Sequence, residues 1–141
     1  MLRAVIDTSV VVAALRSRTG ASNALLRQVA GGRVTALATP ALFLEYEEVL
    51  KQPEQRAVHG LDGEGTERFL AALASAIEPG TVHIGWRPQL RDPSDEMVLE
   101  AAINGRADVI ATFNVRDFLP ETAQFGVSVL RPVEISRRMQ R

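Results

Sequence analysis

Cysteine is absent from this chain of 141 residues, which excludes disulfide bonds, thiolate metal sites and catalysis by a thiol. Long apolar runs are absent too, since a run such as Val10–Leu15 is far too short to cross a bilayer. A strand-like run follows Met1 directly, without the basic segment and long apolar stretch of a signal peptide. We therefore expect a cytoplasmic protein with no membrane segment.

An excess of charge of either sign is also lacking, because the formal net charge is -1. This balance provides no overall attraction to nucleic acid, although a local patch can matter more than the sum. Lysine is nearly absent: Lys51 is the single one, and arginine provides the other basic residues. Hydrophobic residues make up 46% of the chain, enough at this length to bury a core, so we expect one domain over residues 1–141.

Short apolar runs alternate with amphipathic segments along the chain. The runs predict five strands, namely Leu2–Ile6, Val34–Ala38, Thr81–Ile84, Asp108–Thr112 and Gly126–Leu130. The intervening segments predict helices over Thr8–Ser17, Ser22–Ala30, Pro40–Lys51, Thr66–Ile77, Asp95–Asn104 and from Pro132 onward. Thr8 or Ser9 is the expected N-cap of the first helix and Ser22 that of the second. Strands that alternate with helices predict an α/β fold with three layers, α/β/α, around a parallel sheet of about five strands.

Several polar residues follow the expected strands where ligands bind in open parallel sheets, outside the carboxyl ends. Asp7 ends the first strand, and Glu45 lies early in the helix after the second. Asp95 lies at the start of the helix that leads to the fourth strand, which Asn114 and Asp117 follow. The topology therefore brings these five residues to one edge of the sheet.

Helical phase indicates that two of these acids are partly buried. Glu45 borders an apolar stripe formed by Leu42, Tyr46, Val49 and Leu50. Asp95 shares the inner face of its helix with Val98, Leu99 and Ala102, whereas Glu96 and Glu100 are expected to point to solvent. Burying an unpaired carboxylate costs at least several kcal/mol, so a compensating charge is expected nearby.

A hard divalent cation would compensate these carboxylates. Mg²⁺ or Mn²⁺ prefers oxygen ligands and often takes one or two carboxylates plus waters. Such a cation polarises phosphate and lowers the pKa of bound water. The absence of cysteine and the wide separation of His59 and His83 argue against zinc.

Simpler roles remain open for each acid at this stage. Asp7 could be a helix N-cap, and Asp95 could stabilise a helix N-terminus. Glu45 could pair with an arginine such as Arg16. The placement of all three at one edge favours a metal or phosphate site.

Four segments of the chain resemble the motifs of the PIN-domain family, named for the PilT N-terminus. In order they are Val5–Val10, Thr39–Glu45 with Val49 and Leu50, Arg91–Asp95 with Ala101 and Ala102, and Ala107–Thr112. Each segment alone is a weak signal, but their order and spacing are specific. The resemblance covers nearly the whole chain and is greatest to the branch described as toxins of toxin–antitoxin systems.

This resemblance implies a PIN-like fold and Mg²⁺- or Mn²⁺-dependent cleavage of single-stranded RNA. It identifies Asp7, Glu45 and Asp95 as catalytic and metal-binding acids. Thr8, Ser9 and Thr112 match the supporting hydroxyls of the family. It also implies a cognate antitoxin that covers the site, and a homodimer.

One position departs from the family pattern, since Asn114 stands where the family frequently has Asp. An amide oxygen can still bind a metal or its water, and Asp117 can provide a carboxylate from the next turn. We therefore expect one well-held metal and a weaker second site. Candidate contacts to the RNA backbone, each of which could equally be a solvent-exposed charge, are Arg16, Arg87, Arg91 and Arg116.

Other functions fit the sequence less well. A phosphatase of the haloacid-dehalogenase type needs Asp-x-Asp, but Ser9 occupies the second position. A response-regulator receiver needs a lysine after a late strand, and Lys51 lies in a different element. The alternative that remains is a catalytically weak or inactive PIN domain that binds protein or RNA, which Asn114 favours.

Overall fold

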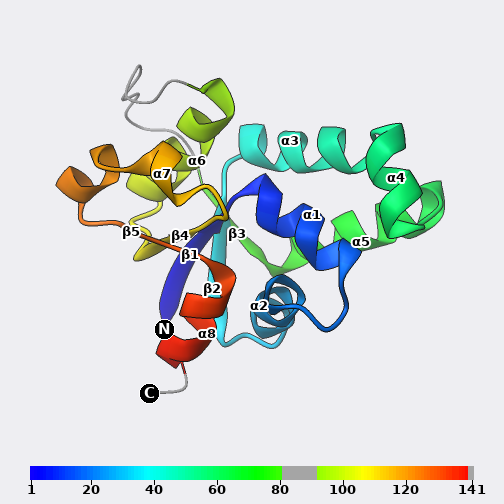
Figure 1. Ribbon diagram of the computed structural model, residues 1–141, viewed down its shortest axis with the longest axis horizontal. Coiled ribbons are helices and arrows are strands. Elements are labelled where there is room, and N and C mark those ends of the chain that lie inside the picture. The colour runs from blue at the N-terminus through cyan, green and yellow to red at the C-terminus, as the bar shows by residue number, and fades with distance from the viewer. Residues whose placement is uncertain (81–91, 140–141) are drawn as a thin grey trace.

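The fold is organised around a parallel sheet of five strands in the order β3-β2-β1-β4-β5 (Figure 1). The computed structural model describes residues 1–80 and 92–139. The strands are β1 (Leu2–Ile6), β2 (Val34–Ala38), β3 (Ile77–Pro79), β4 (Val109–Ala111) and β5 (Ser128–Leu130). All four neighbouring pairs are parallel, as the alternation of strands and helices predicts.

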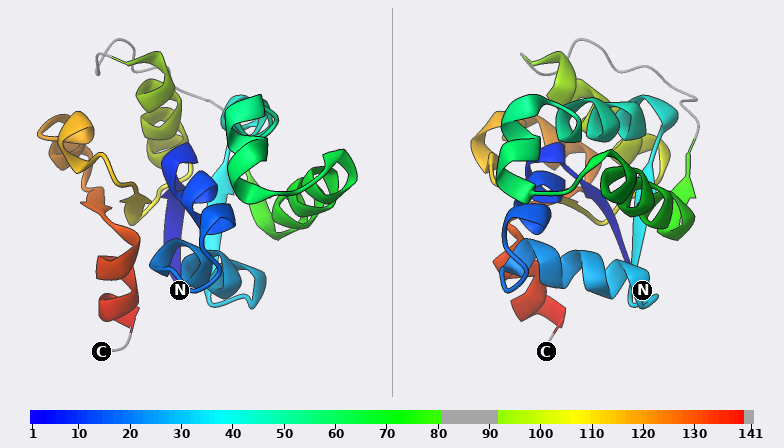
Figure 2. Two further views of the ribbon diagram at one scale, coloured as in Figure 1. Left: turned by 45° about the vertical axis from the view of Figure 1, so that its right-hand side comes forward. Right: turned by 90° about the vertical axis from the view of Figure 1, so that its right-hand side faces the viewer.

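Helices pack on both faces of this sheet, so the expected α/β/α layering is confirmed (Figures 1 and 2). They are α1 (Thr8–Arg16), α2 (Ala21–Ala30), α3 (Pro40–Leu50), α4 (Pro53–His59), α5 (Gly63–Ala76), α6 (Pro93–Asn104), α7 (Val115–Phe118), the 3-10 helix η1 (Glu121–Phe125) and α8 (Pro132–Met139). The polar segment Pro53–Gly65, for which the sequence predicts an irregular stretch with room for a short turn of helix, contains α4.

The central strand β1 explains why the core lies where it does. Its residues Ala4, Val5 and Ile6 are almost fully buried, because strands pair with it on both sides and helices cover both faces. In register, Ala4 pairs with Ala36 of β2 and with Val109 of β4. The carboxyl end of β1 is thereby enclosed between those of β2 and β4.

Helix caps differ from the sequence expectation in two places. Asp7 is the N-cap of α1 in place of Thr8 or Ser9, and its side chain makes no capping hydrogen bond. Gly20 is the N-cap of α2, so Ser22 lies inside the helix. Helix α1 begins at Thr8, as its predicted range does, and α2 begins at Ala21, one residue before its predicted range; each follows an extended N-cap residue.

The third strand is also placed differently. The sequence predicts a helix that ends at Ile77, yet α5 stops at Ala76, and Ile77–Pro79 pairs with β2. A proline is tolerated there because β3 is an edge strand with one unpaired side. The expected strand Thr81–Ile84 lies outside the described residues.

The expected exposure of Glu96 and Glu100 is wrong. These side chains are 4% and 8% exposed, because α6 is covered along much of its circumference. The inner face is as predicted, with Val98, Leu99 and Ala102 fully buried. Helical phase indicates which side of a helix is the most buried. It does not indicate how much of the opposite side other segments cover.

Thr39 offers a test of how α3 is set in place. Its hydroxyl accepts a hydrogen bond from the Leu42 N–H at 3.3 Å, and Pro40 follows at the first helical position. Thr39→Ala should lower the free energy of unfolding by about 1 kcal/mol in chemical denaturation. The control Ser75→Ala, at an exposed hydroxyl late in α5, should change it much less; an equal loss in both variants would contradict the capping role.

Candidate functional site

The carboxyl ends of β1 and β4 bring Asp7 and Thr112 side by side. The Asp7 N–H donates to the Ala111 carbonyl at 2.9 Å, and the Thr112 N–H donates to the Leu130 carbonyl at 3.0 Å. These bonds continue the pairing of the sheet one residue beyond the strands. Residues separated by 105 positions in the chain thus become neighbours.

The Asp7 carboxylate is buried and held by two hydroxyls. Thr112 donates to its Oδ2 at 2.6 Å and Ser9 to the same oxygen at 2.9 Å. Burial raises the pKa of Asp7; the Thr112 and Ser9 hydroxyls oppose this, while the charge of Glu45 adds to it. Because both hydroxyls bind Oδ2, Oδ1 is the oxygen better placed to bind another group.

Two hydrogen bonds join α3 to the junction of β1 and α1. Thr8 donates its hydroxyl proton to Glu45 Oε2 at 2.6 Å, and the buried Tyr46 hydroxyl donates to the Ile6 carbonyl. Burial raises the pKa of Tyr46, and the charges of Asp7 and Glu45 raise it further, which confirms that both acids lie near it. Glu45 is therefore positioned by its own contact and by that of the next residue.

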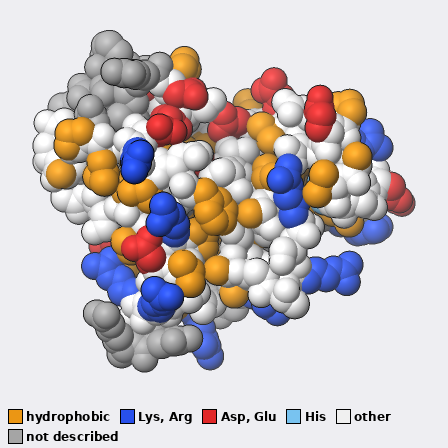
Figure 3. All heavy atoms as spheres, in the orientation of Figure 1, with side chains coloured by type: hydrophobic (Ala, Val, Ile, Leu, Met, Phe, Trp, Pro, Cys, Tyr) orange, Lys and Arg blue, Asp and Glu red, His pale blue; other side chains and the backbone are white. Residues whose placement is uncertain are grey.

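Asp95 enters the same region from the N-terminus of α6. Asp92 caps this helix by accepting the Ser94 N–H at 2.8 Å, so Asp95 lies in the first turn. Burial raises the pKa of Asp95 to about 7, and the charges of Asp92, Asp7, Asp117 and Glu45 contribute in that order. In Figure 3, acidic side chains gather along the upper part of the face over α6, α7 and α3.

These acids are neighbours, but they do not form a compact cluster. Among residues 1–80 and 92–139, no group of three or more histidine or acidic side chains is close enough to hold a metal ion. What the geometry offers is a set of neighbouring carboxylates in which burial, together with nearby negative charge, raises the pKa of Asp7 and Asp95. This set fits a Mg²⁺ or Mn²⁺ ion that takes one or two direct carboxylates and keeps several waters.

Asn114 and Asp117 border this site. Both are exposed, and the Asn114 N–H donates to the Thr112 hydroxyl at 3.0 Å. Asp117 lies near enough for its charge to raise the pKa of Asp95. Both residues reach the edge that the sequence predicts.

The arginines are less clearly connected to the site. Arg16 donates to Gln55 at 3.0 Å and forms no pair with Glu45, so that simpler role of Glu45 is wrong. Arg116 is exposed on α7. Arg87 and Arg91 lie outside the described residues.

Sequence reasoning missed two contributors to this edge. Asp92 is one, and the signal was available, since Asp followed by Pro is a common way to begin a helix. The Tyr46 hydroxyl is the other, because Tyr46 was assigned to the core alone. A buried tyrosine usually needs a hydrogen-bond partner, but the sequence does not indicate that this partner is Ile6.

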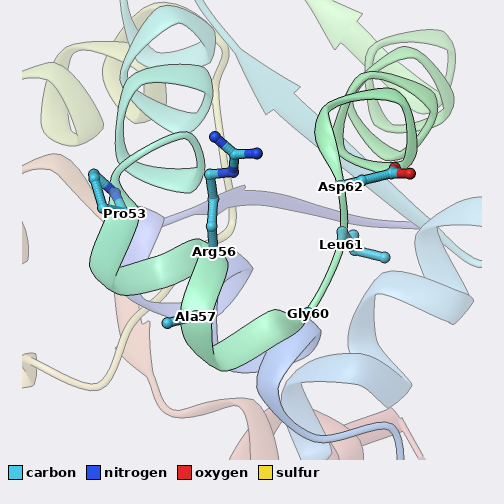
Figure 4. A pocket seen from close by; sticks show the side chains of 6 residues that line it. All are labelled: Pro53, Arg56, Ala57, Gly60, Leu61 and Asp62. Carbon is cyan, nitrogen blue, oxygen red and sulfur yellow. The ribbon is translucent and has the colours of Figure 1, made fainter.

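A pocket of about 440 Å³ lies elsewhere, between α4 and the start of α5 (Figure 4). Its lining residues are Pro53, Arg56, Ala57, Gly60, Leu61 and Asp62. The Asp62 carboxylate already accepts the Gly65 N–H at 2.6 Å as the cap of α5. We therefore assign the site to the acidic edge, which consists of Asp7, Glu45, Asp92, Asp95 and Asp117, and not to this pocket.

Asp95 should make the stability of the protein depend on pH. The folded protein keeps a proton on Asp95 up to about pH 7, whereas the unfolded chain loses it near its ordinary pKa of 3.8. Consequently, the free energy of unfolding should be highest below this range and fall as pH rises through it. Asp95→Asn should flatten this fall in urea denaturation with a chelator present; parallel slopes in both proteins would contradict the raised pKa.

No helix in the described part of the chain is long and apolar enough to span a membrane.

Comparison with known proteins agrees with this geometry. The curated proteins contain no match to the chain. A family model described as PIN domain matches residues 3–116, which include Asp7, Glu45, Asp95 and Thr112. The chain therefore belongs to the PIN-domain family, whose members are generally nucleases.

Proposed function

We propose that this protein is a Mg²⁺- or Mn²⁺-dependent endoribonuclease that cleaves single-stranded RNA. The observation that carries the proposal is the buried Asp7 carboxylate, with the charges of Glu45 and Asp95 near it at one edge of a PIN-domain sheet. Burial and neighbouring carboxylates disfavour the ionised forms of Asp7 and Asp95, and a bound cation would favour them. Phosphodiester hydrolysis is the reaction that such a cation supports best in this family.

Asp7 and Asp95 are the residues proposed to hold the cation. The two hydroxyls on Oδ2 orient Asp7, and Oδ1 is the oxygen that would bind the ion. Asp95 projects from the first turn of α6, close enough to Asp7 for their charges to interact. Asn114 and Asp117 would bind a second, weaker ion or its waters. When bound, the ion stabilises negative charge on the phosphate and lowers the pKa of a bound water.

Glu45 is proposed to orient or deprotonate the attacking water. Its Oε2 is occupied by the Thr8 hydroxyl at 2.6 Å, so Oε1 remains for the water. Thr8 itself begins α1 directly after Asp7, and this fixes Glu45 relative to the metal-binding carboxylate. Water adds at phosphorus, the bond to the leaving ribose oxygen breaks, and that oxygen takes up a proton.

The toxin role is the more specific part of the proposal and rests on the motif resemblance. A toxin needs a cognate antitoxin that covers the acidic edge until it is released. Homodimer formation is proposed on the same ground.

A binding module without catalysis is the second candidate. Asn114 in place of an acid and the open spacing of the carboxylates favour it. Under this alternative the edge would bind RNA or protein without hydrolysis.

A cleavage assay with purified protein and single-stranded RNA tests the proposal. We expect cleavage with Mn²⁺ or Mg²⁺ and none with a chelator. Glu45→Gln should lower kcat by a factor of about 10² to 10⁴, because it removes the general base. The matched control is Glu48→Gln, which alters the same residue type on the exposed side of α3 and should retain activity.

Metal binding separates the enzyme from the module. At about a hundredfold excess over its Kd, Mn²⁺ should stabilise the protein by about 2.7 kcal/mol. This gain should disappear in Asp7→Asn and in Asp95→Asn. If Mn²⁺ changes neither the thermal stability of the protein nor the integrity of the RNA, the proposed nuclease is ruled out.

A further inference from the structure

Charge is strongly segregated along this nearly neutral chain. Residues 8–44 contain four arginines and no acidic residue. Residues 45–126 contain fifteen acidic and seven basic residues, which gives a net charge of -8. The last segment, residues 127–141, has four arginines and a single acid, Glu134. The overall charge of -1 therefore hides two basic segments and one acidic segment.

Folding brings the two basic segments together, because α2 packs against α8. The basic surface, as we define it, consists of five exposed arginines on or next to these helices, namely Arg27, Arg33, Arg131, Arg137 and Arg138. Figures 1 and 3, in the same orientation, show basic side chains on the lower part of the molecule around α8, opposite the acidic upper part. The charges are thus separated in space as well as in sequence.

No described acid forms an ion pair with the arginines of the basic surface, although Glu134 lies on α8 with two of them. Within residues 1–80 and 92–139, the lysine and arginine ion pairs are those of Arg3 and Lys51. The Glu134 carboxylate accepts the Arg131 backbone N–H at 3.1 Å, so it serves the start of α8. Arginines in the last turn of a helix also interact favourably with its dipole, but that effect does not explain a segment of 37 residues, 8–44, without any acid.

The acidic edge by itself repels an RNA strand, so binding of the strand requires positive charge elsewhere. RNA carries one negative charge per nucleotide, and the carboxylates of Asp7, Glu45, Asp92, Asp95 and Asp117 repel it. A cation offsets this repulsion locally but does not hold the rest of the strand. Most of the affinity of proteins for nucleic-acid backbones comes from arginine and lysine contacts to phosphates.

We propose that the basic surface of α2 and α8 binds the phosphate backbone of single-stranded RNA, independently of sequence, while the acidic edge acts on another part of the same strand. This inference rests on the proposed function, which is the reason for naming RNA as the polyanion. Arginine suits the role because its guanidinium forms bidentate contacts to phosphate. Because the surface lies away from the acidic edge, only a long RNA can contact both at once.

The test measures RNA binding by fluorescence anisotropy in the Asp7→Asn background with a chelator, so that no cleavage intervenes. The ligands are unstructured oligouridylates of about 25 and about 5 nucleotides. For the long RNA, the double substitution Arg27→Gln and Arg138→Gln should raise Kd about tenfold and reduce the slope of log K against log salt by about 1.4. The short RNA should bind more weakly than the long one, because it places fewer phosphates on these arginines.

The matched control carries Arg56→Gln and Arg68→Gln, which change the net charge equally at exposed arginines of α4 and α5. This control should bind the long RNA with nearly unchanged Kd. If both double variants weaken binding of the long RNA equally, net charge alone explains the effect and the proposal is overturned. Unchanged binding in the test variant would also overturn it.

Double-stranded DNA of the same length distinguishes the class of polyanion. If it binds more tightly than RNA and loses that affinity in the test variant, the assignment to single-stranded RNA is wrong. These measurements do not depend on catalysis. A wild-type protein that cleaves no RNA would therefore refute the proposed function, while the binding data would still decide the role of the basic surface.

Discussion

The bond between Thr112 and Asp7 is the interaction on which the candidate site depends. A carboxylate at the end of a fully enclosed central strand loses most of its hydration, and this loss is costly unless hydrogen bonds replace the water. The hydroxyls of Thr112 and Ser9 provide those bonds from β4 and α1. The same contacts orient the carboxylate, so the requirement of stability and the requirement of a binding site are met by the same atoms.

The other acids are brought to Asp7 by separate elements, each anchored to the same end of β1. Glu45 is tied to it through Thr8, and the neighbouring Tyr46 through the Ile6 carbonyl. Asp95 arrives on α6, which packs against β1 and β4. Burial is the main reason that the pKa values of Asp7 and Asp95 are raised, and repulsion between neighbouring carboxylates adds to it. Burying these carboxylates lowers the stability of the protein, and the apolar core beneath them offsets this cost.

Charge separation extends this reasoning to the whole molecule. In the proposed function, carboxylates that bind a cation also repel the part of an RNA strand that the cation does not contact. Placing the arginines of α2 and α8 away from the acidic edge resolves this conflict, because screening in physiological salt limits each field to about 8 Å. The two surfaces can then act on different parts of one strand with little mutual cancellation.

The sequence by itself determined the α/β class, four of the five strand positions and the gathering of Asp7, Glu45 and Asp95 at one edge, because periodicity and parallel topology are properties of residue order. The tertiary structure alone decided the position of β3, the burial of Glu96 and Glu100, and the hydrogen bonds of Thr112 and Tyr46. Each of these depends on which distant segment covers a given side chain. Local sequence patterns do not predict such long-range contacts, because these contacts form only when the layers pack together.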